Sequence, residues 1–211
     1  INAGAIMACS LIKPKERDDL RFDHIINTWK KIVGEENVEF DNTVYLSEKL
    51  TANRNHALAH IMMENNIFPE HKNIEKTLQL YFQACSIKMN TKALVKCAAM
   101  LCNGGVIDNK EIFSPDLCKY ILCIMYQSGM YDYSGRWGFD IGLPAKSGVS
   151  GAIFTVIPNF GGICTFSPKL DENGNSVRGV SFFTELVKYY KMHTFDLFSN
   201  NMESKKILIT N

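Results

Sequence analysis

The chain has 211 residues, of which 46% are hydrophobic and 21% are charged, a composition typical of a globular domain with a sizeable core. Its 23 basic and 22 acidic residues are scattered and give a net charge of +1, so we expect no nucleic-acid partner. Because no apolar run reaches the length of about 18 residues that a membrane span needs, we expect no membrane partner either.

Seven cysteines are present, an odd number, and none forms a C-x-x-C pair. We therefore expect buried free thiols in a reducing compartment and a protein that is not secreted. His56 and His60 stand four residues apart and could share a metal ion, but a partly exposed helix face or an interface is the favoured interpretation. We expect no metal and no cofactor. Because the chain begins at Ile1 without an initiator Met, we expect a fragment or a processed product.

Helical periodicity dominates the first 130 residues. The first stretch, 1–13, is apolar nearly all round, as in a helix buried on most sides, and Pro14 ends it before a charged loop at 15–19. Gly34 is a candidate helix C-cap, and Ser114 followed by Pro115 marks a helix start. The remaining helices are predicted over residues 22–33, 42–50, 55–66, 74–85, 91–101 and 114–127.

The pattern changes after residue 130, where most of the 14 glycines fall and the helical period is absent from 131 to 167. Two strands, 152–157 and 163–166, are predicted to form a hairpin across 158–162. The stretch from Asp171 to Ser176 is read as a turn, since it lacks the downstream Glu of a calcium loop. A final helix, marked by apolar residues between 183 and 190, is expected to cover the sheet, and 199–206 to be a linker.

Lys146-Ser147-Gly148 lies where a strand begins, which is one signature of the penicillin-recognising serine enzymes and is also compatible with an ordinary strand entry. Those enzymes further need Ser-x-x-Lys on a helix, which places hydroxyl and amine on one face. Ser10 and Lys13 match this spacing but lie at the end of their helix, whereas a helix start favours developing negative charge. Ser10 is therefore interpreted as a helix-terminal polar residue, and a penicillin-recognising enzyme that uses it stays an alternative.

Several short segments together resemble one family, the serine-dependent glutaminases, and the animal members more than the bacterial ones. They follow the family's order and spacing over about residues 1–192 and comprise Asn2-Ala-Gly-Ala-Ile6, Ser47-Glu48, Arg54-Asn55, Tyr81-Phe82-Gln83 with Cys85-Ser86, Asn103-Gly-Gly105, Ser114-Pro115, Ser128-Gly-Met-Tyr-Asp132, Gly142-Leu-Pro-Ala-Lys-Ser-Gly-Val149, and Ser167-Pro168 with Leu170-Asp171 and Gly174-Asn175-Ser176.

The resemblance implies an α/β (α+β) fold of the β-lactamase and transpeptidase type, with a helical subdomain and an antiparallel sheet covered by helices. The first strands of that sheet are expected to be missing from this chain. We assign residues 1–130 to the mainly helical part, 131–192 to the sheet and its covering helix, and 193–211 to a C-terminal tail or linker.

The resemblance also implies hydrolysis of L-glutamine to L-glutamate and ammonia through an acyl-serine intermediate. In the family, the nucleophilic Ser and the Lys three residues after it precede the segment that begins here at Asn2. Both are therefore expected outside this chain, and the 211 residues alone are expected to be inactive. The alternative is a glutaminase-like module that binds or assembles without chemistry.

Site residues are assigned by matching positions. The resemblance implies that Asn2 and Asn55 hold the amino-acid end of glutamine and that Glu48 pairs with its ammonium group. Its remaining implications are that Tyr81 and Tyr131 are pocket tyrosines, that Tyr131 takes part in proton transfer, and that the Val149 backbone N–H is an oxyanion donor. Lys146 and Ser147 are interpreted as shaping the strand edge, without a direct role.

Partners and location follow from the same resemblance. The ligands are expected to be L-glutamine and L-glutamate, and the intact protein is expected to be a homo-oligomer, a dimer of dimers. Part of that interface is the helix after Asn55, where His56 and His60 differ from related chains. A mitochondrial or cytoplasmic location is expected.

Overall fold

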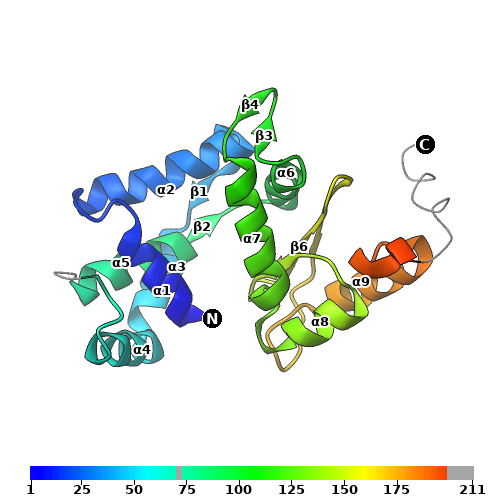
Figure 1. The fold of residues 1–211 in the computed structure, drawn as a ribbon. Helices are drawn as coiled ribbons and strands as arrows, with labels where there is room; N and C mark the ends of the chain where they lie inside the picture. The colour runs from blue at the N-terminus through cyan, green and yellow to red at the C-terminus, as the bar shows by residue number, and fades with distance from the viewer. Residues whose placement is uncertain (70–72, 199–211) are drawn as a thin grey trace. The chain divides into compact units, whose positions relative to one another are not determined.

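The structure, a computed structural model, describes residues 1–69 and 73–198, so the linker expected at 199–206 lies outside the described residues (Figure 1). The chain divides into two compact units, Ile1–Asn90 and Thr91–Asn211. The first is mainly helical, and the second combines helices with a small antiparallel sheet.

Five helices make up most of unit 1, and all were predicted: α1 (Asn2–Leu11), α2 (Asp18–Val33), α3 (Asn42–Leu50), α4 (Asn53–Glu64) and α5 (Ile74–Cys85). A short 3₁₀ helix, η1 (Glu35–Asn37), precedes two strands that were not predicted, β1 (Glu39–Phe40) and β2 (Ile87–Lys88), which pair antiparallel. Helix α5 contacts the other four helices. Its buried side chains, Leu78 and Phe82 among them, pack with Ile6 of α1 and Ala59 of α4 to form the core of the unit.

The ends of these helices follow their sequence signals, with two corrections. Gly34 is the predicted C-cap of α2 and has a φ of 95°, which only glycine adopts readily. The prediction that the first helix is buried on most sides is wrong, because only Ile6, Cys9 and Ser10 of α1 are buried. The charged loop is also shorter than predicted, because its two aspartates form the first turn of α2, where acidic side chains favour the helix dipole.

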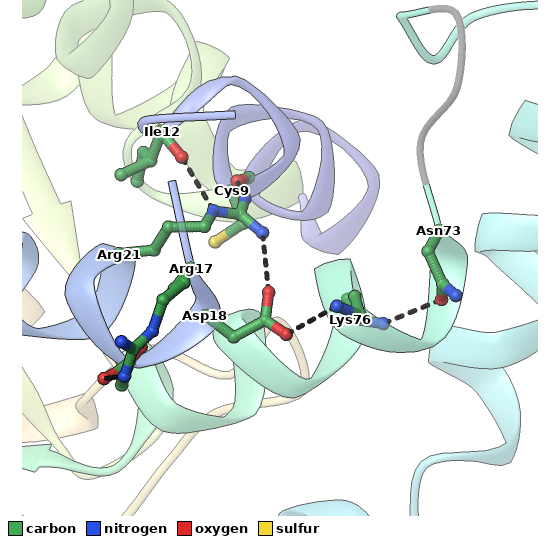
Figure 2. A network of polar contacts seen from close by, with 8 residues as sticks. Cys9, Ile12, Arg17, Asp18, Arg21, Asn73 and Lys76 are labelled. Carbon is green, nitrogen blue, oxygen red and sulfur yellow. Dashed lines mark hydrogen bonds and ion pairs between the residues drawn. The ribbon is translucent and has the colours of Figure 1, made fainter. Parts of the chain in front are cut away.

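A buried guanidinium joins three helices of unit 1 (Figure 2). Arg21 of α2 is 5% exposed, and it donates hydrogen bonds to the carbonyl oxygens of Cys9 (2.7 Å) and Ile12 (2.9 Å) at the end of α1. The same guanidinium lies 3.7 Å from Asp18, whose other carboxylate oxygen is 2.9 Å from the ammonium of Lys76 on α5. Arg21 thus donates to carbonyls at the end of α1, where the Cys9 carbonyl otherwise accepts only a long bond of 3.4 Å from the Ile12 N–H, and it places a cation where the helix dipole favours one.

Unit 2 begins with α6 (Thr91–Cys102), the strands β3 (Val106–Ile107) and β4 (Lys110–Glu111), and α7 (Pro115–Ser128). The predicted start of α7 is confirmed, since the Ser114 hydroxyl accepts a hydrogen bond from the Leu117 N–H. There follow η2 (Tyr131–Tyr133), α8 (Ser134–Asp140), β5 (Ala145–Ser147), β6 (Ala152–Ile157), β7 (Gly161–Phe166), α9 (Val177–Tyr190) and η3 (Thr194–Phe198).

The sheet of unit 2 has the strand order β5-β6-β7, with both pairs antiparallel, and the predicted hairpin is β6-β7. One face carries Ile153 and Ile157, which pack with Phe183 and Val187 of α9. This confirms that the last helix covers the sheet. Helix α6 contacts both strands of the hairpin, so closely that a side chain at Gly162 would overlap α6. A helix thus lies against each face of the hairpin.

The prediction that helical structure is absent after residue 130 is wrong for residues 131–140, which form η2 and α8. Two glycines in α8 weaken its helical signal, because glycine has low helix propensity. Packing compensates for this. Trp137 is completely buried, its ring meets that of Phe183 edge to face, and its Nε1–H donates to the Leu143 carbonyl at 2.8 Å.

All seven cysteines are free thiols, as predicted, but only Cys9, Cys97 and Cys118 are buried. The expectation of buried thiols is wrong for Cys85 and Cys123, which are exposed. Burial raises the pKa of Cys9 and Cys97 to about 11, so both thiols are protonated near neutral pH. Of the helices in the described part of the chain, none combines the length and apolarity needed to cross a membrane.

Candidate functional site

Two side-chain amides that lie 53 residues apart meet in unit 1. Asn2, in the first turn of α1, donates from Nδ2 to Oδ1 of Asn55 in the first turn of α4, at 2.9 Å. Asn55 is buried, whereas Asn2 is exposed. The hydrogen bonds among the described residues leave Oδ1 of Asn2 and Nδ2 of Asn55 unused. The pair can therefore present one acceptor and one donor to a ligand.

Glu48 and Tyr81 come from α3 and α5, which pack against each other. Burial, followed by the Cys85 thiol and the Glu48 carboxylate, raises the pKa of the Tyr81 phenol. The same carboxylate adds to the effect of burial in raising the pKa of Cys85. Glu48 thus places negative charge against a partly buried, protonated phenol. Within residues 1–69 and 73–198, no basic side chain forms an ion pair with Glu48. A cationic ligand would complete the arrangement.

Tyr131 in unit 2 is held in an unusual backbone conformation. Its φ is 53°, in the left-handed region, which costs a residue other than glycine about 1 kcal/mol. The Ser134 hydroxyl donates to the Tyr131 carbonyl at 2.6 Å and accepts from the Met130 N–H at 3.0 Å. The buried amide of Asn175 donates to the Met130 carbonyl at 3.1 Å. Two neutral side chains therefore fix the backbone that presents the Tyr131 ring.

Strand β5 runs directly against the turn that precedes Tyr131. The Ser147 N–H donates to the Gly129 carbonyl at 3.0 Å, and a side chain at Gly129 would overlap the carbonyl of Ala145. This approach places the Lys146 ammonium 4.6 Å from the centre of the Tyr131 ring. Burial lowers the pKa of Lys146. Lys146 was assigned no direct role from the sequence beyond its place in the Lys146-Ser147-Gly148 signature.

The Val149 backbone lies in the turn between β5 and β6, at residues 148–151. The amides of Gly148 and Gly151 are used within this turn, whereas the Val149 N–H donates to no other group of the described residues. A side chain built on Gly174 would lie 3.8 Å from the Tyr131 ring and 3.9 Å from the Val149 side chain. The structure therefore brings Tyr131 and Val149 together around Gly174, leaving one backbone donor for a ligand.

The other candidates do not form sites. Ser10 is fully buried and its hydroxyl donates to the Met7 carbonyl at 2.7 Å, while Lys13 lies beyond the end of α1, so the nucleophile alternative has no geometric support. His56 pairs with Glu75 at 3.5 Å. No group of three His, Cys, Asp or Glu side chains in the described ranges could hold a metal ion. Asp171 accepts from two backbone amides of its own loop, which confirms the predicted turn.

A cavity of ≈ 700 Å³ lies elsewhere in unit 2, at the end of α6 and the tip of the β6-β7 hairpin. Lys96, Met100 and Phe160 line it, together with other residues of these segments. No predicted site residue is among its lining residues.

Comparison with known proteins gives one consistent result. Residues 1–195 match the family model described as Glutaminase. A glutaminase-like protein of Caenorhabditis elegans is 46% identical over 208 residues, which are 97% of this chain and 34% of that relative. The mitochondrial liver isoform of glutaminase from Rattus norvegicus is 40% identical over 198 residues, 93% of this chain and 33% of the relative. The chain thus spans about a third of the length of these curated relatives.

Solved structures are similar as well. One is the covalent complex between the Bacillus subtilis glutaminase YbgJ and 5-oxo-L-norleucine, formed by reaction of that protein with 6-diazo-5-oxo-L-norleucine. Its TM-score is 0.86 at 30% sequence identity, and the match covers 92% of this chain and 69% of that chain. Another solved structure, of a probable glutaminase from Bacillus subtilis, has a TM-score of 0.85 at 29% identity. These similarities confirm the predicted α/β fold class of the β-lactamase type.

Proposed function

The chain belongs to the glutaminase family, and we propose that the whole protein hydrolyses L-glutamine to L-glutamate and ammonia. The observation that carries the proposal is the Glu48 carboxylate, which lies by a partly buried phenol and forms no ion pair within the described residues. An acid in this setting selects a ligand with a free ammonium group, such as an α-amino acid.

Unit 1 is proposed to hold the amino-acid end of glutamine. The α-ammonium group would pair with Glu48, and the protonated Tyr81 would remain a hydrogen-bond donor beside it. The Asn2–Asn55 pair has a free amide donor and a free amide acceptor, which suit the α-carboxylate and the α-ammonium group respectively. Both roles are binding roles, since neither a neutral amide nor a phenol with a raised pKa is suited to accept a proton.

Unit 2 is proposed to act on the side-chain amide. A serine hydroxyl attacks the amide carbon, its proton passes by way of Tyr131 to the leaving nitrogen, and ammonia departs to leave an acyl-serine that water hydrolyses. The unused Val149 N–H would donate to the oxygen that becomes negative during attack. The serine, with a lysine three residues after it, is expected outside this chain. The 5-oxo-L-norleucine bound by the Bacillus subtilis relative has a carbonyl where glutamine has its amide carbonyl, which supports the proposed substrate.

Assembly and location are further proposals. Helix α4 exposes Ile61 and Met63, which supports a contact between copies of the chain within a dimer of dimers. A mitochondrial location is supported by the rat relative.

The test is release of ammonia from L-glutamine by the whole purified protein, measured beside the 211-residue chain alone. We expect activity from the whole protein and none from the chain alone, because the serine is expected outside it. Glutamine binding by the whole protein without any ammonia would instead support the non-catalytic binding module.

A further inference from the structure

Lys146 occupies a position that stability does not explain. It is half-buried in β5 between the buried Ala145 and Ser147, and it pairs across the sheet with Phe154. Its ammonium donates to the Ser147 carbonyl and lies over the Tyr131 ring, and no acid among the described residues forms an ion pair with it. Removing an ammonium group from water without a carboxylate partner is unfavourable. Such a placement is retained where the charge has a function.

Both partners of this contact are held by fixed structure. Lys146 lies in a strand paired with β6, and the Tyr131 backbone is fixed through Ser134 and Asn175. A second lysine over a tyrosine, Lys119 with Tyr120, lies further from its ring, at 5.7 Å, on two exposed side chains of α7. The contact of Lys146 is therefore a built feature of the fold.

A fixed cation beside a phenol favours the negatively charged form of that phenol. Other charged or titratable groups on the segments around Tyr131 are Asp132 and Tyr133 of its own 3₁₀ helix, Arg136 and Asp140 of α8, which form an ion pair with each other, and Asp171 in the turn before α9. The aspartates oppose the effect of Lys146. Two backbone amides of its own loop donate hydrogen bonds to the Asp171 carboxylate. Lys146 is the basic group with a defined contact to the ring.

From this geometry we infer that Lys146 is a positioning residue that acts through Tyr131, holding its ring and stabilising negative charge on its oxygen. The inference rests on the proposed function. The proton of the attacking serine hydroxyl passes to the Tyr131 oxygen and then to the departing amide nitrogen. Lys146 keeps its own proton throughout and forms no bond to substrate.

The test compares Lys146→Met, Lys146→Arg and the control Lys188→Met in the whole protein. Lys188 is exposed on α9 and pairs with Glu185. For Lys146→Met we expect kcat at neutral pH to fall about tenfold, with KM for glutamine unchanged within about threefold. Without the cation, deprotonation of Tyr131 requires higher pH. The rising limb of the pH profile of kcat therefore moves to higher pH by about one unit. Lys146→Arg restores most of both effects, and Lys188→Met changes neither.

A uniform loss of activity at every pH, or failure of the arginine variant to restore the profile, would show that Lys146 is only structural. An independent measurement does not need turnover. The titration of Tyr131 is followed by NMR in protein labelled at tyrosine ¹³Cζ, and the signal is assigned with Tyr131→Phe. If the wild-type protein releases no ammonia, the proposed function fails. The Tyr131 midpoint must still rise in Lys146→Met, and an unchanged midpoint overturns the inference itself.

Discussion

The two compact units place a tyrosine in opposite electrostatic surroundings. Tyr81 of unit 1 is buried, and burial, the Cys85 thiol and the Glu48 carboxylate together raise its pKa and keep it protonated. Tyr131 of unit 2 lies under the ammonium of Lys146. The difference shows that residue type alone does not assign a role. The charge beside each phenol fits the proposed binding role of Tyr81 and the proposed role of Tyr131 as a proton acceptor.

The same contrast extends to the scaffolds. Unit 1 holds its helices through one buried charge, the guanidinium of Arg21, which is paired with the partly exposed Asp18 and, through it, with the exposed Lys76. Unit 2 fixes the Tyr131 turn with neutral groups, the Ser134 hydroxyl and the Asn175 amide. Removing a buried charged group destabilises the fold by several kcal/mol, because its partners lose their counter-charge or donor. Removing one neutral hydrogen bond costs about 1 kcal/mol. The two units should therefore differ in how they respond to single substitutions.

The largest expected effect is that of Arg21→Met, which should destabilise unit 1 by about 4 kcal/mol, because it removes two hydrogen bonds from a charged group at about 2 kcal/mol each. The lost bonds are those to the carbonyls of Cys9 and Ile12, and Asp18 keeps only Lys76 as its cation. Hydrogen exchange should rise across residues 2–11 and stay unchanged in 152–157. The control is Arg17→Met, since Arg17 pairs with Asp19 on the exposed surface, where no change is expected. If hydrogen exchange in α1 is unchanged in the Arg21 variant, the charged contacts of Arg21 do not hold the helices of unit 1 together.

Next in size is the effect of Glu48→Gln on substrate binding. Loss of the carboxylate removes the partner of the substrate ammonium group. The binding free energy of glutamine should weaken by about 3 kcal/mol, which corresponds to an increase in KM of about 100-fold. Little change in kcat is expected, because the proposed role of Glu48 is binding. Steady-state kinetics of the whole protein measure both constants. The control is Glu185→Gln, because the Glu185 side chain is exposed on the outer face of α9. A fall in kcat with unchanged KM would assign Glu48 to the chemical step. The contrast between a binding unit 1 and a catalytic unit 2 would then be wrong.

The sequence predicts those helices and strands whose signal lies in neighbouring residues, and it misses those that depend on tertiary packing. The helices of unit 1 were predicted because apolar side chains recur at helical spacing, and Ser114-Pro115 marked α7 directly. Helix α8 was missed because Gly135 and Gly138 lower local propensity, while Trp137 stabilises the helix through tertiary packing.

The candidate site shows the same limit. Family resemblance, and not periodicity, supplied the positions Asn2, Glu48, Asn55, Tyr81, Tyr131 and Val149. The contact of Lys146 with Tyr131 was not predictable, because it requires a left-handed backbone at a tyrosine. The burial of Arg21 was missed for a similar reason, since an arginine in an amphipathic helix usually faces solvent.

A smaller effect is expected from Ser134→Ala, which removes the hydroxyl that links the Met130 N–H to the Tyr131 carbonyl. Without this link the strained turn at Tyr131 can relax, and kcat should fall about tenfold, equivalent to about 1.4 kcal/mol. The matched control is Ser181→Ala, whose hydroxyl donates to the Val177 carbonyl on the exposed face of α9. Wild-type kinetics in the Ser134 variant would mean that packing alone holds the ring.

The smallest expected effect has the opposite sign. Thr155 of β6 is fully buried on the face that α9 covers, and its hydroxyl has no hydrogen-bond partner in the described part of the chain. Thr155→Val replaces the hydroxyl with a methyl group of similar size, so unfolding should require about 1 kcal/mol more, seen as a higher Tm. The control Thr184→Val removes a hydroxyl that does donate, to the Val180 carbonyl, and should bring no gain. A lower Tm for Thr155→Val would show that the buried hydroxyl stabilises unit 2. The two units would then be alike in depending on buried polar contacts.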